Sequence, residues 1–359
     1  MRRLLAGRTA RHFEIDNRGL AIRFHCSQPA RILGDNEMMR GNLCSRNCDR
    51  RGLPAGIERS PILQRKRKMT RHIPVLALIG LSALLPVWAA EGPFFITYTH
   101  KMEEPGNLEF ATKNVVGRPD GGNRFLGTAA EFEYGLKGWW TTELYLDGQA
   151  TGAQSALFTG YRWENRFRLL THEHWINPVL YLEFENINGA DKSLLEIVNH
   201  DGNDDITEPN ADIRSEKKRE LEAKLILSSY YKGWTIAENF IAEKNLKHEP
   251  FEFGYAVGIS RPLAMAARPE RCNVCAENFQ IGVEIYGGLG THADFGLRGT
   301  SHYIAPTVAW TLANGTTFKV SPGFGVTNAS TGYLLRFGVS YEIAQFGRTA
   351  RNLFHGGRQ

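Results

Sequence analysis

The stretch Phe251-Glu-Phe-Gly-Tyr-Ala-Val-Gly-Ile-Ser260 alternates large apolar residues with small or polar ones. Successive side chains of a β-strand point to opposite faces, so one face of this segment is apolar and aromatic while the other carries Glu252, Ser260 and small residues. A tilted strand needs about ten residues to cross a bilayer. The stretch therefore predicts a membrane-spanning strand with an apolar outer face.

The same alternation recurs along the rest of the chain, and after residue 90 no run is apolar for the 18 residues that a transmembrane helix needs. The pattern predicts strands at 107–116, 124–136, 138–148, 154–168, 178–187, 220–232, 234–244, 251–262, 278–287, 302–313, 316–327 and 332–343. We therefore expect an all-β fold, a transmembrane antiparallel β-barrel of about twelve strands over residues 107–343.

Connection lengths support this prediction, because outer-membrane barrels have short periplasmic turns and longer outer loops. Short turns at 136–138, 232–233 and 313–315 fall where periplasmic turns are expected, and the longest connection, 188–219, falls on the outer side. Two expected periplasmic connections, 169–177 and 263–277, are longer than the rule predicts.

Aromatic residues gather beside the expected periplasmic turns: Trp139 and Trp140 at one, and Tyr230, Tyr231 and Trp234 at another. Such residues form girdles at the level of the lipid headgroups. A soluble β-sandwich is the alternative, but its strands rarely reach this length with outward aromatics at both ends.

Residues 69–89 have a charged start, a short apolar centre and a small-residue end, which predicts a signal peptide cleaved after Ala89 or Ala90. Residues 1–68 then form a non-native upstream extension, 90–106 an N-terminal periplasmic segment and 344–359 a C-terminal tail. The extension holds 16 Lys/Arg against 6 Asp/Glu, whereas 91–359 hold 26 against 32. The overall net charge of +5 thus comes from the extension, and no nucleic-acid partner is expected.

Strand parity directs twelve acidic and seven basic side chains to the barrel interior, since charged groups are costly on the lipid side. They are Glu109, Lys113, Glu131, Glu133, Glu143, Asp147, Arg162, Glu164, Arg166, Arg168, Glu183, Glu185, Glu222, Lys224, Glu252, Glu284, Lys319, Arg336 and Glu342.

The fourth strand, rich in arginine, lies between two acidic strands. Its guanidinium groups can therefore meet carboxylates of the neighbouring strands. The expected pore-lining set is Glu143, Asp147, Arg162, Glu164, Arg166, Arg168, Glu183 and Glu185. This arrangement has two interpretations. It either lines an open pore with a transverse field or forms a salt-bridged core that fills the barrel.

Cys272 and Cys275 are the two cysteines outside the first 90 residues, and in an exported protein they are expected to form one disulfide. After residue 90 the chain has no convincing group of catalytic residues. We therefore expect no enzyme activity and no cofactor, and we assign no metal ligands. The alternatives are a salt-bridged structural or surface-binding barrel, with the loop 188–219 as the binding part, and an outer-membrane lipid-modifying enzyme.

The stretches Gly138–Asp147, Glu164–Arg168, Trp175–Glu183 and Leu335–Glu342 resemble a family of uncharacterised bacterial outer-membrane β-barrels often described as porins or transporters. The resemblance implies an outer-membrane location, passage of a small polar or amphiphilic solute, and contact with outer-membrane lipid, lipopolysaccharide and the barrel-assembly machinery. Barrel chains of this kind commonly end on an aromatic residue, whereas here Ala344 to Gln359 follow the last strand.

Overall fold

The computed structural model describes residues 92–355 except 196, 199–203, 248 and 267–271. The predicted extension 1–68 and signal peptide 69–89 lie outside the described residues and stay predictions. Among the described helices, none is long and apolar enough to cross a membrane.

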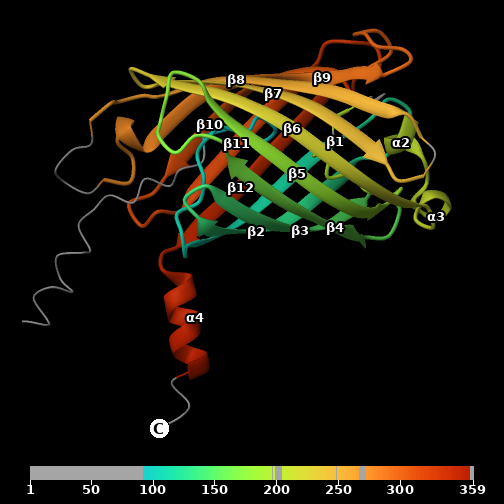
Figure 1. Ribbon diagram of the computed structural model, residues 1–359. Helices are drawn as coiled ribbons and strands as arrows, with labels where there is room; N and C mark the ends of the chain where they lie inside the picture. Colours follow the sequence, from blue (N-terminus) through green and yellow to red (C-terminus); the bar gives the residue numbers. More distant parts are fainter. Residues whose placement is uncertain (1–91, 196, 199–203, 248, 267–271, 356–359) are drawn as a thin grey trace, which may run out of the picture. The chain divides into compact units, whose positions relative to one another are not determined.

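Twelve antiparallel strands form one closed barrel in which each strand pairs with its neighbours in sequence (Figure 1). The first and last strands close it along a continuous register from Leu108↔Ile343 to Gly117↔Leu334. The strands are β1 (Leu108–Gly117), β2 (Phe125–Lys137), β3 (Trp140–Thr151), β4 (Leu157–Arg168), β5 (Asn177–Asn188), β6 (Lys217–Tyr231), β7 (Trp234–Asn245), β8 (Phe251–Pro262), β9 (Phe279–Thr291), β10 (His302–Thr311), β11 (Thr317–Gly325) and β12 (Tyr333–Ile343). The predicted fold and strand number are confirmed.

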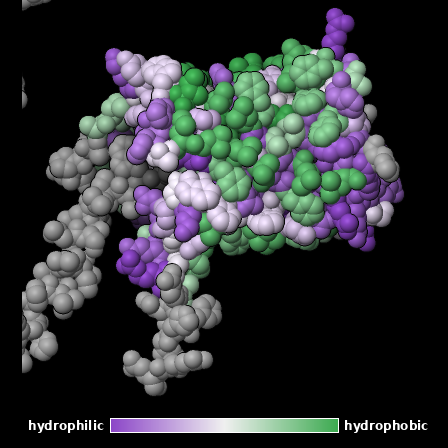
Figure 2. Space-filling model, in the orientation of Figure 1, coloured by the Kyte–Doolittle hydropathy of each residue, from purple (hydrophilic) through white to green (hydrophobic). Residues whose placement is uncertain are grey.

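The strands bury alternate residues, as the sequence pattern requires. On β8, Ala256 is buried and its neighbours Tyr255 and Val257 are more exposed, and the same alternation runs through the other strands. Figure 2 shows apolar residues gathered over the middle of the wall and polar residues gathered at its two ends. A closed barrel with an apolar belt satisfies its backbone without water, and it places this protein in the outer membrane.

One exposed carboxylate interrupts the belt. Glu238 lies on the outward face of β7 between Ile236 and Phe240, and it pairs across the sheet with Leu227 and Val257.

Short turns join the strands at one end, and the longest connection lies at the other. At the turn between β6 and β7, Lys232 and Gly233 both have positive φ angles, 49° and 85°, which is typical of a two-residue type I′ hairpin. The termini of the barrel lie at this end, which is periplasmic by the usual orientation. The longer periplasmic connection between β8 and β9 contains a disulfide between Cys272 and Cys275 and the 3₁₀ helix η2 (Ala276–Asn278).

The predicted aromatic clusters lie at the same end. Trp140 stacks on Trp139 and Phe167, and Trp175 makes an edge contact with Tyr231. The outer connection between β5 and β6 holds two short helices, α2 (Asp204–Thr207) and α3 (Asn210–Ile213), and α4 (Phe346–His355) follows β12.

The apolar belt predicts a strong cost for an outward charge. Phe240 is 53% exposed on the outer face of β7, so Phe240→Arg should lower the free energy of unfolding in lipid vesicles by about 2–4 kcal/mol. Leu246, just beyond the outer end of the same strand, is 53% exposed, and Leu246→Arg should cost about 1 kcal/mol or less. Denaturant titration followed by tryptophan fluorescence measures both. Equal costs at the two positions would contradict the belt.

Candidate functional site: a closed lumen

The predicted pore-lining side chains all lie on the lumen side of the wall. Seven of the eight are buried, with 5% or less of their surface exposed, and Arg168 is half-buried. Six of them, Glu143, Asp147, Arg162, Glu164, Arg166 and Glu185, form two networks, each centred on one arginine of β4.

Arg162 is the centre of the outer network. Its Nε lies 2.9 Å from Oδ2 of Asp147 on β3, and its Nη1 lies 2.8 Å from Oε2 of Glu185, its register partner on β5. Its Nη2 donates to Asp191 and Ser193, at 3.3 and 3.2 Å. Because Asp191 and Ser193 belong to the connection between β5 and β6, this arginine also fixes an outer loop inside the barrel.

Arg166 is the centre of the inner network. Its Nη2 lies 2.5 Å from Glu133 and 3.3 Å from Glu143, and its Nε lies 2.8 Å from Glu164. Nearby, Lys113 Nζ lies 2.8 Å from Glu131. Charge-assisted hydrogen bonds of this kind are short and directional.

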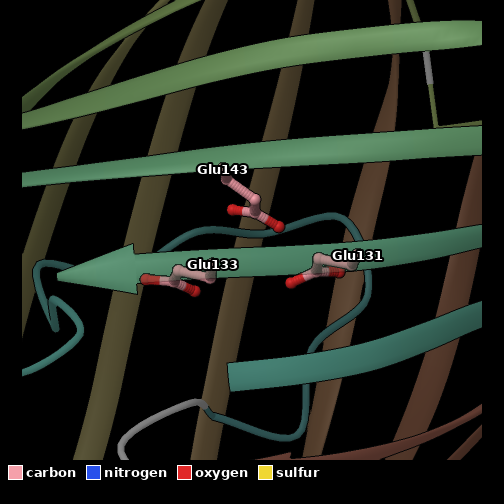
Figure 3. Close-up of side chains that lie close together, drawn as sticks. All are labelled: Glu131, Glu133 and Glu143. Atoms are coloured by element: carbon pink, nitrogen blue, oxygen red, sulfur yellow. The ribbon is translucent and has the colours of Figure 1, made fainter. Parts of the chain in front are cut away.

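Glu131, Glu133 and Glu143 form a carboxylate cluster on β2 and β3 (Figure 3). One oxygen of each lies within 4.8 Å of the others, which is close enough to share a metal ion. The ammonium group of Lys113 and the guanidinium of Arg166 already bind these three carboxylates. Two protein cations thus already contact the three carboxylates from within the wall.

A second acidic group lies on the adjoining wall, where Glu183, Glu185 and Glu222 are close enough to share an ion. Lys224 Nζ lies 2.7 Å from Glu222, and Arg162 binds Glu185. Arg168, predicted as part of the same ladder, instead donates from Nη2 to the backbone oxygen of His100 at 3.0 Å.

The segment 92–104, which precedes β1, enters the lumen and crosses it. The backbone N–H groups of Phe95, Ile96 and Thr97 donate to the two carboxylate oxygens of Glu284 on β9, at 2.9, 2.9 and 2.7 Å. Tyr98 donates its backbone N–H to Asn239 Oδ1 and accepts from Asn239 Nδ2. We call residues 92–104 the inner segment.

The side chain of Tyr98 joins the inner segment to the arginine network. Its hydroxyl lies 2.9 Å from the hydroxyl of Tyr145 and 3.0 Å from Glu164 Oε2. The guanidinium of Arg166 lies over its ring at 5.4 Å. Burial raises the pKa of the Tyr98 hydroxyl, and the charge of Glu164 raises it further.

Gly258 on the wall makes room for the inner segment. A Cβ added there would lie 2.8 Å from Cζ of Phe94. Residues 90–106 are predicted to lie in the periplasm, whereas the structure buries Phe94 to Thr97 inside the barrel. The difference arises because the lumen offers carboxylate, amide and hydroxyl partners to a segment that has no strand partner.

The connection between β5 and β6 enters the lumen from the opposite end. Lys192 is 1% exposed and donates from Nζ to Thr151 Oγ1 and Asn210 Oδ1, at 3.1 and 3.2 Å. Burial lowers the pKa of its ammonium group. Gly254 again makes room, since a Cβ there would lie 3.1 Å from Val198 Cγ1. We call residues 189–216 the outer segment.

The two segments contribute to one buried apolar cluster. Phe95 and Ile96 of the inner segment belong to the same buried apolar cluster as Ile197 and Val198 of the outer segment, together with Val115 and other wall residues. Two cavities beside Phe95 and Lys113 measure about 30 and 10 Å³, room for a few water molecules at most. The inner and outer segments therefore occupy the part of the lumen around Phe95 and Lys113.

His100, Ser228 and Glu173 are arranged like a base, a hydroxyl and an acid. Ser228 Oγ lies 2.5 Å from His100 Nδ1, and His100 Nε2 lies 3.4 Å from Glu173 Oε1. In hydrolases this order activates a nucleophile. Here Ser228 is 1% exposed and also accepts the backbone N–H of His100. The arrangement holds the inner segment in place and leaves no approach for a substrate.

No family model and no curated protein matches the chain. Among solved structures, the KdgM porin in complex with disordered oligogalacturonate shares 8% identity, with 66% of this chain and 98% of that one covered and a TM-score of 0.39. An outer-membrane channel from Pseudomonas putida F1 shares 9%, with 68% and 98% covered and a TM-score of 0.41. LpxR from Salmonella typhimurium shares 9%, with 66% and 99% covered and a TM-score of 0.30.

The two inserted segments were not expected from the sequence, although one signal for them exists. Inward positions of small barrels are normally filled by side chains. Gly254, Gly258 and Gly338 occupy such positions without filling them. Glycine on the inward face of a strand indicates close approach of another chain segment.

Gly258 should therefore be sensitive to even a methyl group. Gly258→Ala should displace Phe94 and weaken insertion of the inner segment by roughly 1–3 kcal/mol. Trypsin cleavage after Lys101, which requires the segment to leave the lumen, should accelerate. Gly323→Ala is the matched control, because its Cβ would lie at an ordinary 3.4 Å from Tyr286. Identical cleavage rates in the two variants would rule out this packing role.

Acid should loosen the inner segment through His100. Burial lowers the pKa of this imidazole, with Glu173 opposing the shift and Arg168 and Lys101 adding to it. The His100 imidazole therefore binds a proton more weakly in the inserted segment than in the free segment. Insertion is fully stable above the ordinary histidine pKa of about 6.5, and it weakens as the pH falls below that value. Hydrogen exchange of residues 94–103 should thus be less protected at pH 5.5 than at pH 7.5. His100→Gln should remove this pH dependence, and its persistence there would assign it to other groups.

Proposed function

We propose that this protein is an outer-membrane channel for small polar solutes that is closed at rest by the inner segment and opens when that segment leaves. The observation that carries the proposal is the way the segment is held. From Phe95 to His100 its backbone bonds to side chains of β6, β7 and β9, while the strands keep their own ladders. Its departure would leave the barrel wall intact.

The wall behind the inner segment supports this function. Arg162 and Arg166 on β4 face carboxylates of β2, β3 and β5. Opposed charges of this kind orient polar solutes and select among ions. We assign the constriction to Glu143, Asp147, Arg162, Glu164, Arg166, Arg168, Glu183 and Glu185.

A second candidate is a structural barrel that never conducts. The observation that favours it is the filled lumen, with cavities of only about 30 and 10 Å³ beside the inner segment. Buried ion pairs shared by several carboxylates are also costly to separate. The two candidates differ in whether the lumen opens once the inner segment is loosened.

Planar-bilayer recording of refolded 90–359 separates them. Glu284→Gln weakens the three backbone hydrogen bonds that hold Phe95, Ile96 and Thr97, each worth about 1.5–3 kcal/mol when the acceptor is charged. We expect the open probability to rise roughly tenfold or more. Arg162→Ala should then change the ion selectivity of the open state.

Glu238→Gln is the control, because Glu238 lies on the outer face of the barrel and is outside the lumen networks described above. Its conductance should equal that of the unaltered chain. If Glu284→Gln stays silent while hydrogen exchange shows that the inner segment is released, the inner segment is not what closes the channel, and the proposal fails.

A further inference from the structure

Charged residues are rare on the lipid-facing side of the barrel wall. Within the described strands, the outward faces of β1, β3, β4, β5, β9, β10, β11 and β12 carry none. On β8 the outward charge is Arg261, at the periplasmic end, with its guanidinium 5.4 Å from the ring of Trp234. Three further outward cations gather at the outer ends of β6 and β7, namely Lys217, Arg219 and Lys244. We call these three residues the rim cations.

The strand register places the rim cations side by side. Lys217 and Arg219 are two residues apart on β6, so their side chains share one face. Lys244 of β7 lies opposite Leu221, the next outward residue of β6, and is therefore a diagonal neighbour of Arg219. Diagonal neighbours are about 7–8 Å apart, a spacing that long side chains span. One multivalent anion can thus contact all three cations.

The rim cations have no carboxylate partner in the part of the chain that the structure describes. The ammonium group of Lys244 donates to the backbone oxygen of Glu249 and lies 5.5 Å from the centre of the Phe251 ring. The arginines of the lumen differ, since Arg162 and Arg166 each bind several carboxylates. The rim therefore carries positive charge that an anion from outside the chain can neutralise.

Apolar side chains continue the same outward surface toward the middle of the wall. Leu221 and Phe251 each have 49% of their surface exposed, and Phe184 of β5 lies opposite Leu221. The rim belongs to the end of the barrel that carries α2 and α3, whereas α4 leaves from the other end (Figure 1). The rim cations thus lie at the level of the outer-leaflet headgroups, and the apolar residues lie at the level of the acyl chains.

We propose that the rim of β6 and β7 is a binding site for one lipopolysaccharide molecule, with the phosphates of its lipid A on Lys217, Arg219 and Lys244. An acyl chain of the same molecule packs on Leu221 and Phe251. Lipid A carries two phosphates on one disaccharide, and guanidinium and ammonium groups bind phosphate through short, charge-assisted hydrogen bonds. The rim cations distinguish this part of the circumference from the eight strands whose outward faces meet lipid without any charge.

Native mass spectrometry of the purified chain in detergent, titrated with bisphosphorylated lipid A, tests this site. We expect one lipid A to be retained per barrel, with binding that weakens as salt screens the exposed charges. Combining Lys217→Gln, Arg219→Gln and Lys244→Gln should weaken binding roughly tenfold or more. Arg261→Gln is the matched control, because it removes an outward cation at the opposite end of the wall and should leave binding unchanged.

Two further measurements keep the test decisive. Arg219→Gln alone should weaken binding several-fold, and it replaces the triple variant if that variant loses heat-modifiable mobility on gels. Lipid A without its phosphates has the same acyl chains and should bind the unaltered chain at least tenfold more weakly. Equal binding of that lipid, or unchanged affinity in the glutamine variants, would overturn the proposal. So would an equal loss in Arg261→Gln, or equally tight retention of phosphatidylglycerol, because either would indicate a general attraction of anionic lipid.

Discussion

Charged side chains enclosed within a barrel must be paired there, and this constraint shapes the interior. Removing an ion from water costs several kcal/mol unless opposite charges and hydrogen bonds replace the solvent. Arg162 supplies one positive charge and hydrogen-bond donors to Asp147, Glu185 and Asp191. Arg166 does the same for Glu133, Glu143 and Glu164. Since each guanidinium holds three carboxylates from different parts of the chain, the positions of neighbouring strands and of the outer segment depend on two side chains of β4.

The same requirement explains why parts of the chain outside the strands enter the lumen. Glu284 has its carboxylate satisfied by three peptide N–H groups of the inner segment. Backbone amides are donors that carry no net charge, so they stabilise an acidic wall without demanding further counter-ions. The outer segment contributes both signs, with Asp191 at Arg162 and Lys192 at Thr151 and Asn210. Behind these polar contacts, Phe95, Ile96, Ile197 and Val198 belong to one buried apolar cluster.

The strands could be predicted because side chains of a β-strand alternate between lipid and lumen. Segments such as Phe251–Ser260 therefore alternate between apolar and small or polar residues. Parity also predicted which charged side chains face inward, because lipid does not tolerate them in number. The hydrogen-bond partners of these side chains within the lumen were less predictable. Arg168 shares the parity of Arg166, yet it binds the backbone of His100, a residue far away in the sequence.

The inner segment could not be located from its own residues. Gly92 to Glu103 has no period of two, and the side chains that bind its backbone include Ser228, Asn239 and Glu284, more than a hundred residues later in the chain. Docking of such a segment depends on the shape of a lumen that forms only when the barrel closes. The glycines of the wall were the available sign, and in sequence they look like the ordinary small residues of a barrel interior.

The position of the inner segment also constrains the order of events during biogenesis. Its residues leave the ribosome before any strand does, yet the walls that surround them are completed only when β12 pairs with β1. The segment must therefore be held near the unfinished sheet until that seam closes, or it must thread afterwards through the periplasmic opening. In either case, the first residues of the barrel chain to be synthesised are among the last to reach their final contacts.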